Sequence, residues 1–104
     1  MNTSSIHYAE ERRSRREFID QYIGEGNIVA SFVVNNGHPG GAEIHDVTDT
    51  AIIIVRNQKT GKLITELIAR PEQLKRLYAL IGEKPPSKLL SLAYKHNAKK
   101  YNER

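Results

Sequence analysis

The sequence predicts one α+β domain over residues 1–104, with an N-terminal helix, an antiparallel sheet of about four strands and two C-terminal helices. Short apolar runs rich in β-branched residues occupy the middle of the chain, and segments with helical spacing of apolar residues flank them. A chain of 104 residues is typical of a single domain. Because the connections between the central runs are too short for parallel crossovers, consecutive strands predict an antiparallel meander.

A β-hairpin forms the centre of this prediction. Residues 51–55 are apolar and largely β-branched, and such side chains pack well on a pleated surface. Residues 62–68 form a second run with apolar side chains on one face at period two. Between them, Asn57 can open a type I turn, and Gly61 can take the left-handed conformation that closes the turn with a bulge.

Two further strands are expected before the hairpin. Residues 28–34 are apolar on both faces, which indicates a strand buried on both sides. Residues 35–41 contain three glycines and a proline and predict a loop whose backbone can approach a ligand closely. Residues 43–47 predict the second strand, and residues 48–50 a turn into the hairpin.

The first helix is expected over residues 5–23. Ser4 or Ser5 can cap its start, and Gly24 can end it in the left-handed conformation. Residues 10–17 are almost wholly charged, so we expect this part to face water with ion pairs along the helix. Its four arginines are Arg12, Arg13, Arg15 and Arg16.

The clearest amphipathic helix begins at Pro71, a residue favoured at the first helical position because its missing N–H costs nothing there. Gly82 is expected to end it. Its apolar residues recur at helical spacing and should pack against the hairpin. The predicted contacts join Leu74, Leu77, Tyr78 and Ile81 to Ile53, Val55, Leu63 and Leu67.

The last helix follows the break at residues 85–86, and Ser87 can cap it. The sequence becomes polar after Tyr94, so residues 97–104, like residues 1–4, are expected to fray. The net charge is +4, and the whole excess lies in the last 22 residues. A basic C-terminal segment on a neutral body favours a polyanionic partner, and an ordinary solvated helix face is the alternative.

The composition excludes several classes of site. The chain has no cysteine, which excludes disulfides and thiolate metal sites and fits a reducing compartment. No apolar run approaches the roughly 18 residues of a membrane span, and the N-terminus is charged rather than signal-like. We therefore expect a cytoplasmic protein with no membrane partner.

Two histidines are the first candidates for chemistry. His38 lies in the glycine-rich loop, and His45 lies on the second strand with Glu43 on the same face. Because imidazole exchanges its proton near neutral pH, this pair suits general acid–base catalysis. The alternatives are a turn residue for His38 and a half-exposed strand residue for His45. Two histidines at this spacing do not make a metal motif.

A second group of polar side chains lies on the hairpin, namely Arg56, Lys62, Thr65, Glu66 and Arg70. Cationic side chains on a sheet face can hold a phosphate, and arginine can do so with two parallel hydrogen bonds. Without a bulge, Thr65 would face away from Lys62, Glu66 and Arg70. The alternative is a charged outer face with Glu66 paired across strands and Thr65 at the edge of the core.

Four pieces of the sequence carry a family resemblance: GHPGGAEIH, the hydrophobic strand, TGKLIT and IARPEQLKRLY. Through them, residues 28–78 resemble the core of small proteins of bacterial phages and mobile elements that are similar to the barnase–colicin–RelE-like ribonuclease superfamily. The resemblance implies a sheet face that cleaves RNA without a metal or other cofactor. It also implies that His38 and His45 are acid–base groups, Thr65 a polar contact and Arg70 a phosphate clamp.

The expected function is therefore that of a metal-independent, toxin-like endoribonuclease of a phage or mobile element. Its expected partners are RNA and either a cognate inhibitor protein or the ribosome. Two other classes remain open, a non-catalytic nucleic-acid-binding module and an accessory protein that binds another protein. The expected contacts to nucleic acid outside the catalytic group are Arg56, Lys62, Lys95, Lys99 and Lys100.

Overall fold

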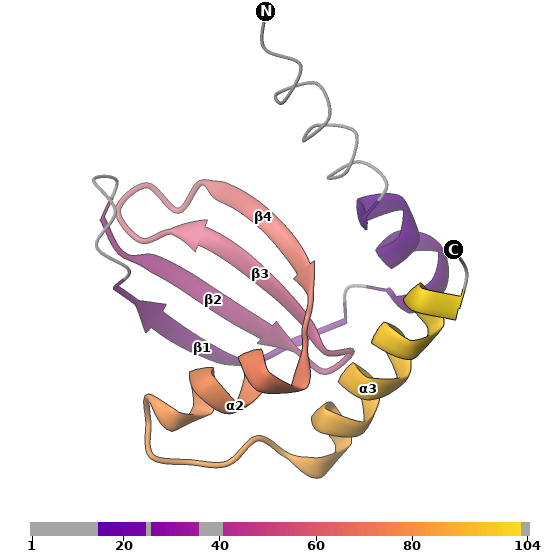
Figure 1. Cartoon of the computed structure of the whole chain (residues 1–104). Helices are drawn as coiled ribbons and strands as arrows, with labels where there is room; N and C mark the ends of the chain where they lie inside the picture. The colour runs from indigo at the N-terminus through magenta and orange to yellow at the C-terminus, as the bar shows by residue number, and fades with distance from the viewer. Residues whose placement is uncertain (1–14, 25, 36–40, 103–104) are drawn as a thin grey trace, which may run out of the picture.

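The computed structural model describes residues 15–24, 26–35 and 41–102, and these form an α+β fold with one antiparallel sheet (Figure 1). The strands lie in the order β1-β2-β3-β4, so each pairs with its neighbour in sequence, which confirms the predicted meander. Residues 15–18 are α-helical and continue into a short π-helix. The elements are η1 (Ile19–Ile23), β1 (Ile28–Val34), β2 (Glu43–Thr48), β3 (Ile52–Asn57), β4 (Leu63–Ile68), α2 (Pro71–Ala79) and α3 (Ser87–Asn102).

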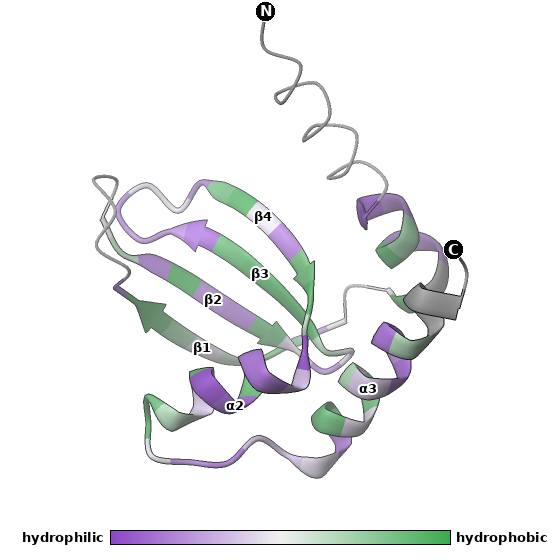
Figure 2. Cartoon of the chain, viewed as in Figure 1, coloured by the Kyte–Doolittle hydropathy of each residue, from purple (hydrophilic) through white to green (hydrophobic). Residues whose placement is uncertain are grey.

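The main core lies between one face of the sheet and the two C-terminal helices. Figure 2 shows hydrophobic colour along most of β3, and side chains at alternate positions of a strand point to opposite faces. Phe32 and Tyr78 meet edge to face with 4.9 Å between ring centroids, which fixes α2 on the sheet. The buried side chains of this cluster are Phe32, Val47, Ala51, Ile53, Val55, Ala69, Leu74, Leu77, Tyr78, Leu89 and Ala93.

A smaller cluster lies on the other face of the sheet, under residues 15–23, which we call the N-terminal helical segment. Ile19 of η1 is completely buried against Ile52 and Ile68. The π-helix ends where the Gly24 amide donates to the Ile19 carbonyl over 2.7 Å. Gly24 has φ 80° and ψ 146°, so the positive φ was predicted correctly but the left-handed helical conformation was not.

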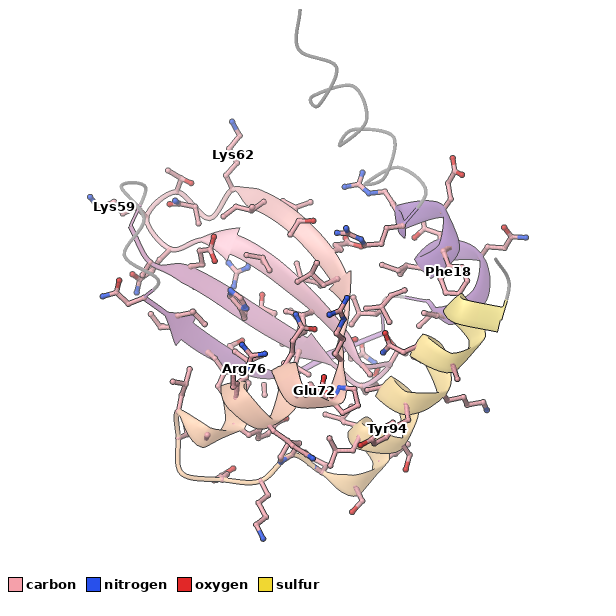
Figure 3. The ribbon with its side chains drawn as sticks, viewed as in Figure 1. Phe18, Lys59, Lys62, Glu72, Arg76 and Tyr94 are labelled. Carbon is pink, nitrogen blue, oxygen red and sulfur yellow. The ribbon has the colours of Figure 1, made fainter. Side chains whose placement is uncertain are left out.

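The hairpin turn has the chemistry that the sequence predicts. The Gly61 amide donates to the Asn57 carbonyl over 2.8 Å, and Gly61 has φ 72°. The Asn57 side chain accepts hydrogen bonds from two amides inside the turn. Lys59 and Lys62 project from this end of the sheet into solvent (Figure 3).

Two side chains predicted to pack between α2 and the hairpin are exposed, and the prediction that β1 is buried on both faces is wrong, since Ile28, Val29 and Val33 are more than half exposed. Leu63 is 44% exposed because a bulge shifts the pairing of β3 with β4, and the next residue, Ile64, packs against the core instead. Ile81 is 56% exposed because α2 ends before it, in a turn closed by hydrogen bonds from Gly82 to Ala79 and from Glu83 to Tyr78. That pair of bonds is a Schellman motif, with Gly82 at φ 71°.

The C-terminal helices otherwise follow the prediction. Pro71 is the first residue of α2, as predicted, whereas Ser87 is the first residue inside α3 rather than its cap, since the Leu90 amide donates to the Pro86 carbonyl over 3.2 Å. Helix α3 continues to Asn102, past residue 97 where fraying was expected. The expected start of the first helix and the frayed residues 1–4 lie outside the described residues. No helix in the described ranges is long and apolar enough to cross a lipid bilayer.

The packing of α2 on the sheet predicts a contrast between two neighbouring leucines. Leu77 is 7% exposed and Leu80 is 60% exposed. Replacing Leu77 with Ala should lower the free energy of unfolding by about 2–5 kcal/mol, because it removes buried methyl groups and leaves a cavity. Leu80→Ala, the matched control, should change it by no more than about 0.5 kcal/mol. Urea denaturation measures both, and equal effects would show that α2 does not pack as described.

Candidate functional site

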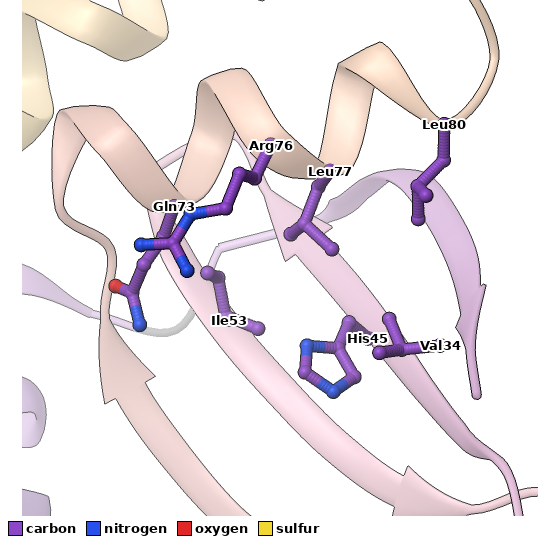
Figure 4. Close-up of a pocket in the computed structure, with 7 residues that line it drawn as sticks. All are labelled: Val34, His45, Ile53, Gln73, Arg76, Leu77 and Leu80. Atoms are coloured by element: carbon purple, nitrogen blue, oxygen red, sulfur yellow. The ribbon is translucent and has the colours of Figure 1, made fainter. Parts of the chain in front are cut away.

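A pocket of about 330 Å³ opens between α2 and the sheet, and we call it the histidine pocket (Figure 4). Its floor comes from the strands and its wall from α2. His45 is its ionisable group on the sheet, and Arg76 its cation on the helix. The lining residues in the described chain are Val34, His45, Ile53, Gln73, Arg76, Leu77 and Leu80.

His45 is paired with a carboxylate. Its Nε2 atom lies 3.2 Å from Oε1 of Glu43, two residues earlier on β2, and the side chains are 18% and 21% exposed. The prediction that both lie on one face is therefore confirmed. A carboxylate that accepts a hydrogen bond from one ring nitrogen fixes the tautomer and orientation of an imidazole. Both side chains are therefore partly accessible to a bound molecule.

The helix supplies the polar groups above this pair. Gln73 and Arg76 are three residues apart, so both lie on the side of α2 that faces the sheet. Figure 4 shows the Arg76 guanidinium beside the Gln73 amide, with both side chains reaching toward the strand that carries Ile53. No carboxylate in the described part of the chain lies within 4 Å of the Arg76 nitrogens. The pocket thus combines an acid–base group with a cation, over an otherwise apolar lining.

Thr65 and Arg70 lie away from the histidine pocket. His45 pairs with Val55, which pairs with Thr65, so Thr65 is two strands from His45, about 10 Å. The Thr65 hydroxyl accepts a hydrogen bond of 3.3 Å from Nη1 of Arg15. Arg70 precedes α2 and is exposed. Of the predicted catalytic residues, the three that the structure describes, His45, Thr65 and Arg70, do not form one cluster.

Arg70 lines a second pocket, of about 120 Å³, at the end of β4, which we call the arginine pocket. The Arg15 guanidinium reaches the same pocket from the N-terminal helical segment, where its Nη1 also donates to the Glu66 carbonyl over 3.1 Å. Gln73 lines both pockets, so they are neighbours along α2. The lining residues are Arg15, Leu67, Ile68, Arg70, Gln73 and Asn97.

Arg56 lies on the opposite face of the sheet, in a network around a buried carboxylate. Its Nε donates to Oδ2 of Asp46 over 2.8 Å, and the Ser31 hydroxyl donates to Oδ1 over 2.5 Å. Asp46 is only 1% exposed. Burial disfavours its charged form, but the hydrogen bonds from Arg56 and Ser31 outweigh burial and hold the pKa of Asp46 below its ordinary value of 3.8. Arg56 therefore has a structural partner that the sequence prediction did not include.

The remaining predicted residues are spread over the molecule. Lys62 is exposed at the hairpin end, and Lys95 is exposed on α3. His38 lies outside the described residues, and the side chains of Lys99 and Lys100 are likewise not described. No group of three or more His, Asp or Glu side chains in the described ranges has the arrangement of a metal site.

Sequence reasoning did not single out three residues that the pockets contain: Arg15, Gln73 and Arg76. The last two carry a readable signal, because residues 70, 73 and 76 recur at a spacing that aligns them along one side of a helix. No sequence signal distinguishes Arg15, since it is one of four arginines in a charged run. Its position at the end of β4 depends on how the first helix packs on the sheet.

Comparison of the chain with family models, with curated proteins and with solved structures found no match in any of the three.

The Asp46 network predicts an acid-dependent loss of stability. Because the pKa of Asp46 is lowered in the folded state, the network stabilises the protein above the ordinary value of 3.8, and this contribution is lost as the pH falls through the lowered pKa. Asp46→Asn should therefore lower the melting temperature at pH 7, and the difference from the wild type should narrow below pH 4. Asp20→Asn, at an exposed carboxylate, is the control. A difference that is constant with pH would contradict the lowered pKa.

Proposed function

We propose that the protein cleaves RNA without a metal ion, in the histidine pocket. The observation that carries this proposal is that His45, which Glu43 contacts over 3.2 Å, lines the same pocket as Arg76. Cleavage of an RNA strand needs a base, an acid and a cation near the phosphate, and no nucleophile from the protein. In this proposal, His45 with Glu43 supplies the base, and Arg76 supplies the cation.

In the proposed reaction, His45 takes the proton from a ribose 2′-OH while Glu43 holds the imidazole in place. The 2′-oxygen attacks the adjacent phosphorus, the bond to the 5′-oxygen breaks, and the products are a 2′,3′-cyclic phosphate and a 5′-hydroxyl. Arg76 lies where a guanidinium can stabilise the charge that builds up on the phosphorane oxygens. The leaving 5′-oxygen must also gain a proton, and His38 is the predicted donor.

This chemistry selects RNA over DNA because DNA lacks the attacking 2′-OH. A free ribonuclease would endanger its host. A cognate inhibitor or an activity restricted to the ribosome is therefore part of the proposal, together with a phage or mobile-element origin. Arg70, Arg56 and the lysines of α3 are not needed for the chemical step in this scheme.

A protein-interaction module is the second candidate, and the apolar lining of the histidine pocket favours it. Val34, Leu77 and Leu80 give the pocket a surface suited to an apolar side chain. Beside it, Leu80 and Ile81 are 60% and 56% exposed. An accessory protein would use such a surface to hold a partner, and His45 would then contribute to binding rather than to catalysis.

Replacing His45 with Ala tests the proposed function. Loss of a general base typically slows a reaction by about 10²–10⁴-fold, and we expect a loss of that size. The melting temperature should change little, since His45 is partly exposed at the pocket surface. The measurement is the cleavage of end-labelled RNA in the presence of EDTA, with detection of 2′,3′-cyclic phosphate ends.

His96→Gln is the matched control, because His96 donates to the Thr50 carbonyl over 3.1 Å, outside both pockets, and a glutamine amide can replace that bond. This variant should cleave RNA at the wild-type rate. If the wild-type protein leaves RNA intact, both alone and with ribosomes, the ribonuclease proposal is wrong and the interaction module takes its place.

A further inference from the structure

Two guanidinium groups from distant parts of the chain meet in the arginine pocket. Arg15 comes from the N-terminal helical segment, and Arg70 precedes the first turn of α2. Within residues 15–24, 26–35 and 41–102, no carboxylate lies within 4 Å of either guanidinium, and none lines the pocket. Two cations that share a small pocket repel each other unless an anion lies between them.

The pocket holds its donors in place. Arg15 is fixed by the 3.1 Å bond from Nη1 to the Glu66 carbonyl, and a guanidinium has five N–H groups, so others remain for a ligand. Gln73 uses its Oε1 to accept the Arg70 amide over 2.9 Å, which leaves its side-chain N–H groups as donors. The Asn97 amide donates to the carbonyls of Ala69 and Ala93, over 2.9 and 2.7 Å, and so anchors α3 behind the pocket.

The size of the pocket limits what it can hold. A pocket of about 120 Å³ has room for a group the size of a tetrahedral oxyanion. Arginine binds phosphate oxygens through two parallel hydrogen bonds. The donor set of two arginines and one amide fits such a group.

The arginine pocket also continues the histidine pocket. Gln73 lines both, with Arg76 on one side of it and Arg70 and Arg15 on the other. Three guanidinium groups therefore follow one another from His45 to the end of β4. A polyanion with regularly spaced phosphates can contact all three, which a single small anion cannot.

We propose that the arginine pocket binds one backbone phosphate of an RNA strand. The next phosphodiester linkage of the same strand then lies at His45, where it is cleaved. That the strand is RNA rests on the proposed function. That the pocket binds a phosphate group does not depend on it. The arginine pocket holds the strand in position and takes no part in the breaking of a bond.

The test uses an oligonucleotide that cannot be cleaved, so that binding is measured apart from catalysis. A fluorescent strand with 2′-O-methyl groups at every position is titrated with protein, and anisotropy gives the dissociation constant. Arg15→Ala and Arg70→Ala should each weaken binding by about tenfold to a hundredfold, the effect expected for a charge-assisted hydrogen bond. Arg15→Lys should weaken binding less, because it keeps the charge and loses the paired donors.

Arg16→Ala and Lys75→Ala are the matched controls. Each removes one positive charge from an exposed position close in sequence to the tested arginine and outside both pockets, and should change binding by about twofold or less. Circular dichroism confirms that each variant is folded, and Arg15→Lys replaces Arg15→Ala if the latter is not. Equal effects in tested and control variants would overturn the proposed subsite.

A second titration, with inorganic phosphate, distinguishes the source of the phosphate group. We expect competition with the oligonucleotide only at high phosphate concentration, since free phosphate reaches one pocket alone. If inorganic phosphate binds as tightly as the oligonucleotide, the RNA assignment is wrong. Wild-type protein that binds the strand through Arg15 and Arg70 but never cleaves RNA would refute the ribonuclease proposal and leave the phosphate subsite in place.

Discussion

The strand β3 must be buried on both of its faces, and the arrangement of the other elements follows from this constraint. Ile53 and Val55 face the main core, while Ile52 faces the smaller cluster with Ile19. A sheet covered on one side only would leave part of this strand in water. Two C-terminal helices on one face and a short N-terminal helical segment on the other remove the apolar surface, which is the main favourable contribution to folding.

The same constraint places the two pockets. Helix α2 covers the part of the sheet above Ile53, and His45 lies on the same face one strand away, at the margin of that covered area. The smaller cluster brings the N-terminal helical segment to the edge of β4, where Arg15 meets the groups at the start of α2. His45 and Arg15 therefore both lie at the boundary between the covered and the uncovered parts of the sheet.

Most of the fold was predictable from the sequence, because local patterns determine it. The Asn57–Gly61 turn, Pro71 at the start of α2 and the apolar run of β3 each act within a few residues. The exposed Leu63 was not predictable, because a bulge is a property of the paired strands rather than of one strand. Of the candidate site, the His45–Glu43 pair follows from strand alternation. The separation of Arg70 from His45, the Asp46 partner of Arg56 and the position of Arg15 depend on tertiary packing.

The two edges of the sheet differ. Along β4, the Glu66 carbonyl accepts Arg15, and the Ala69 carbonyl beyond the strand accepts Asn97, so side chains occupy backbone groups that could otherwise pair with another strand. Strand β1 carries no charged residue, and its exposed side chains include Val29 and Val33. Of the two edges, β1 is therefore the one at which an added strand would meet no charged side chain of the edge strand itself. Growth in that direction would leave the arginine pocket, at the far edge, accessible.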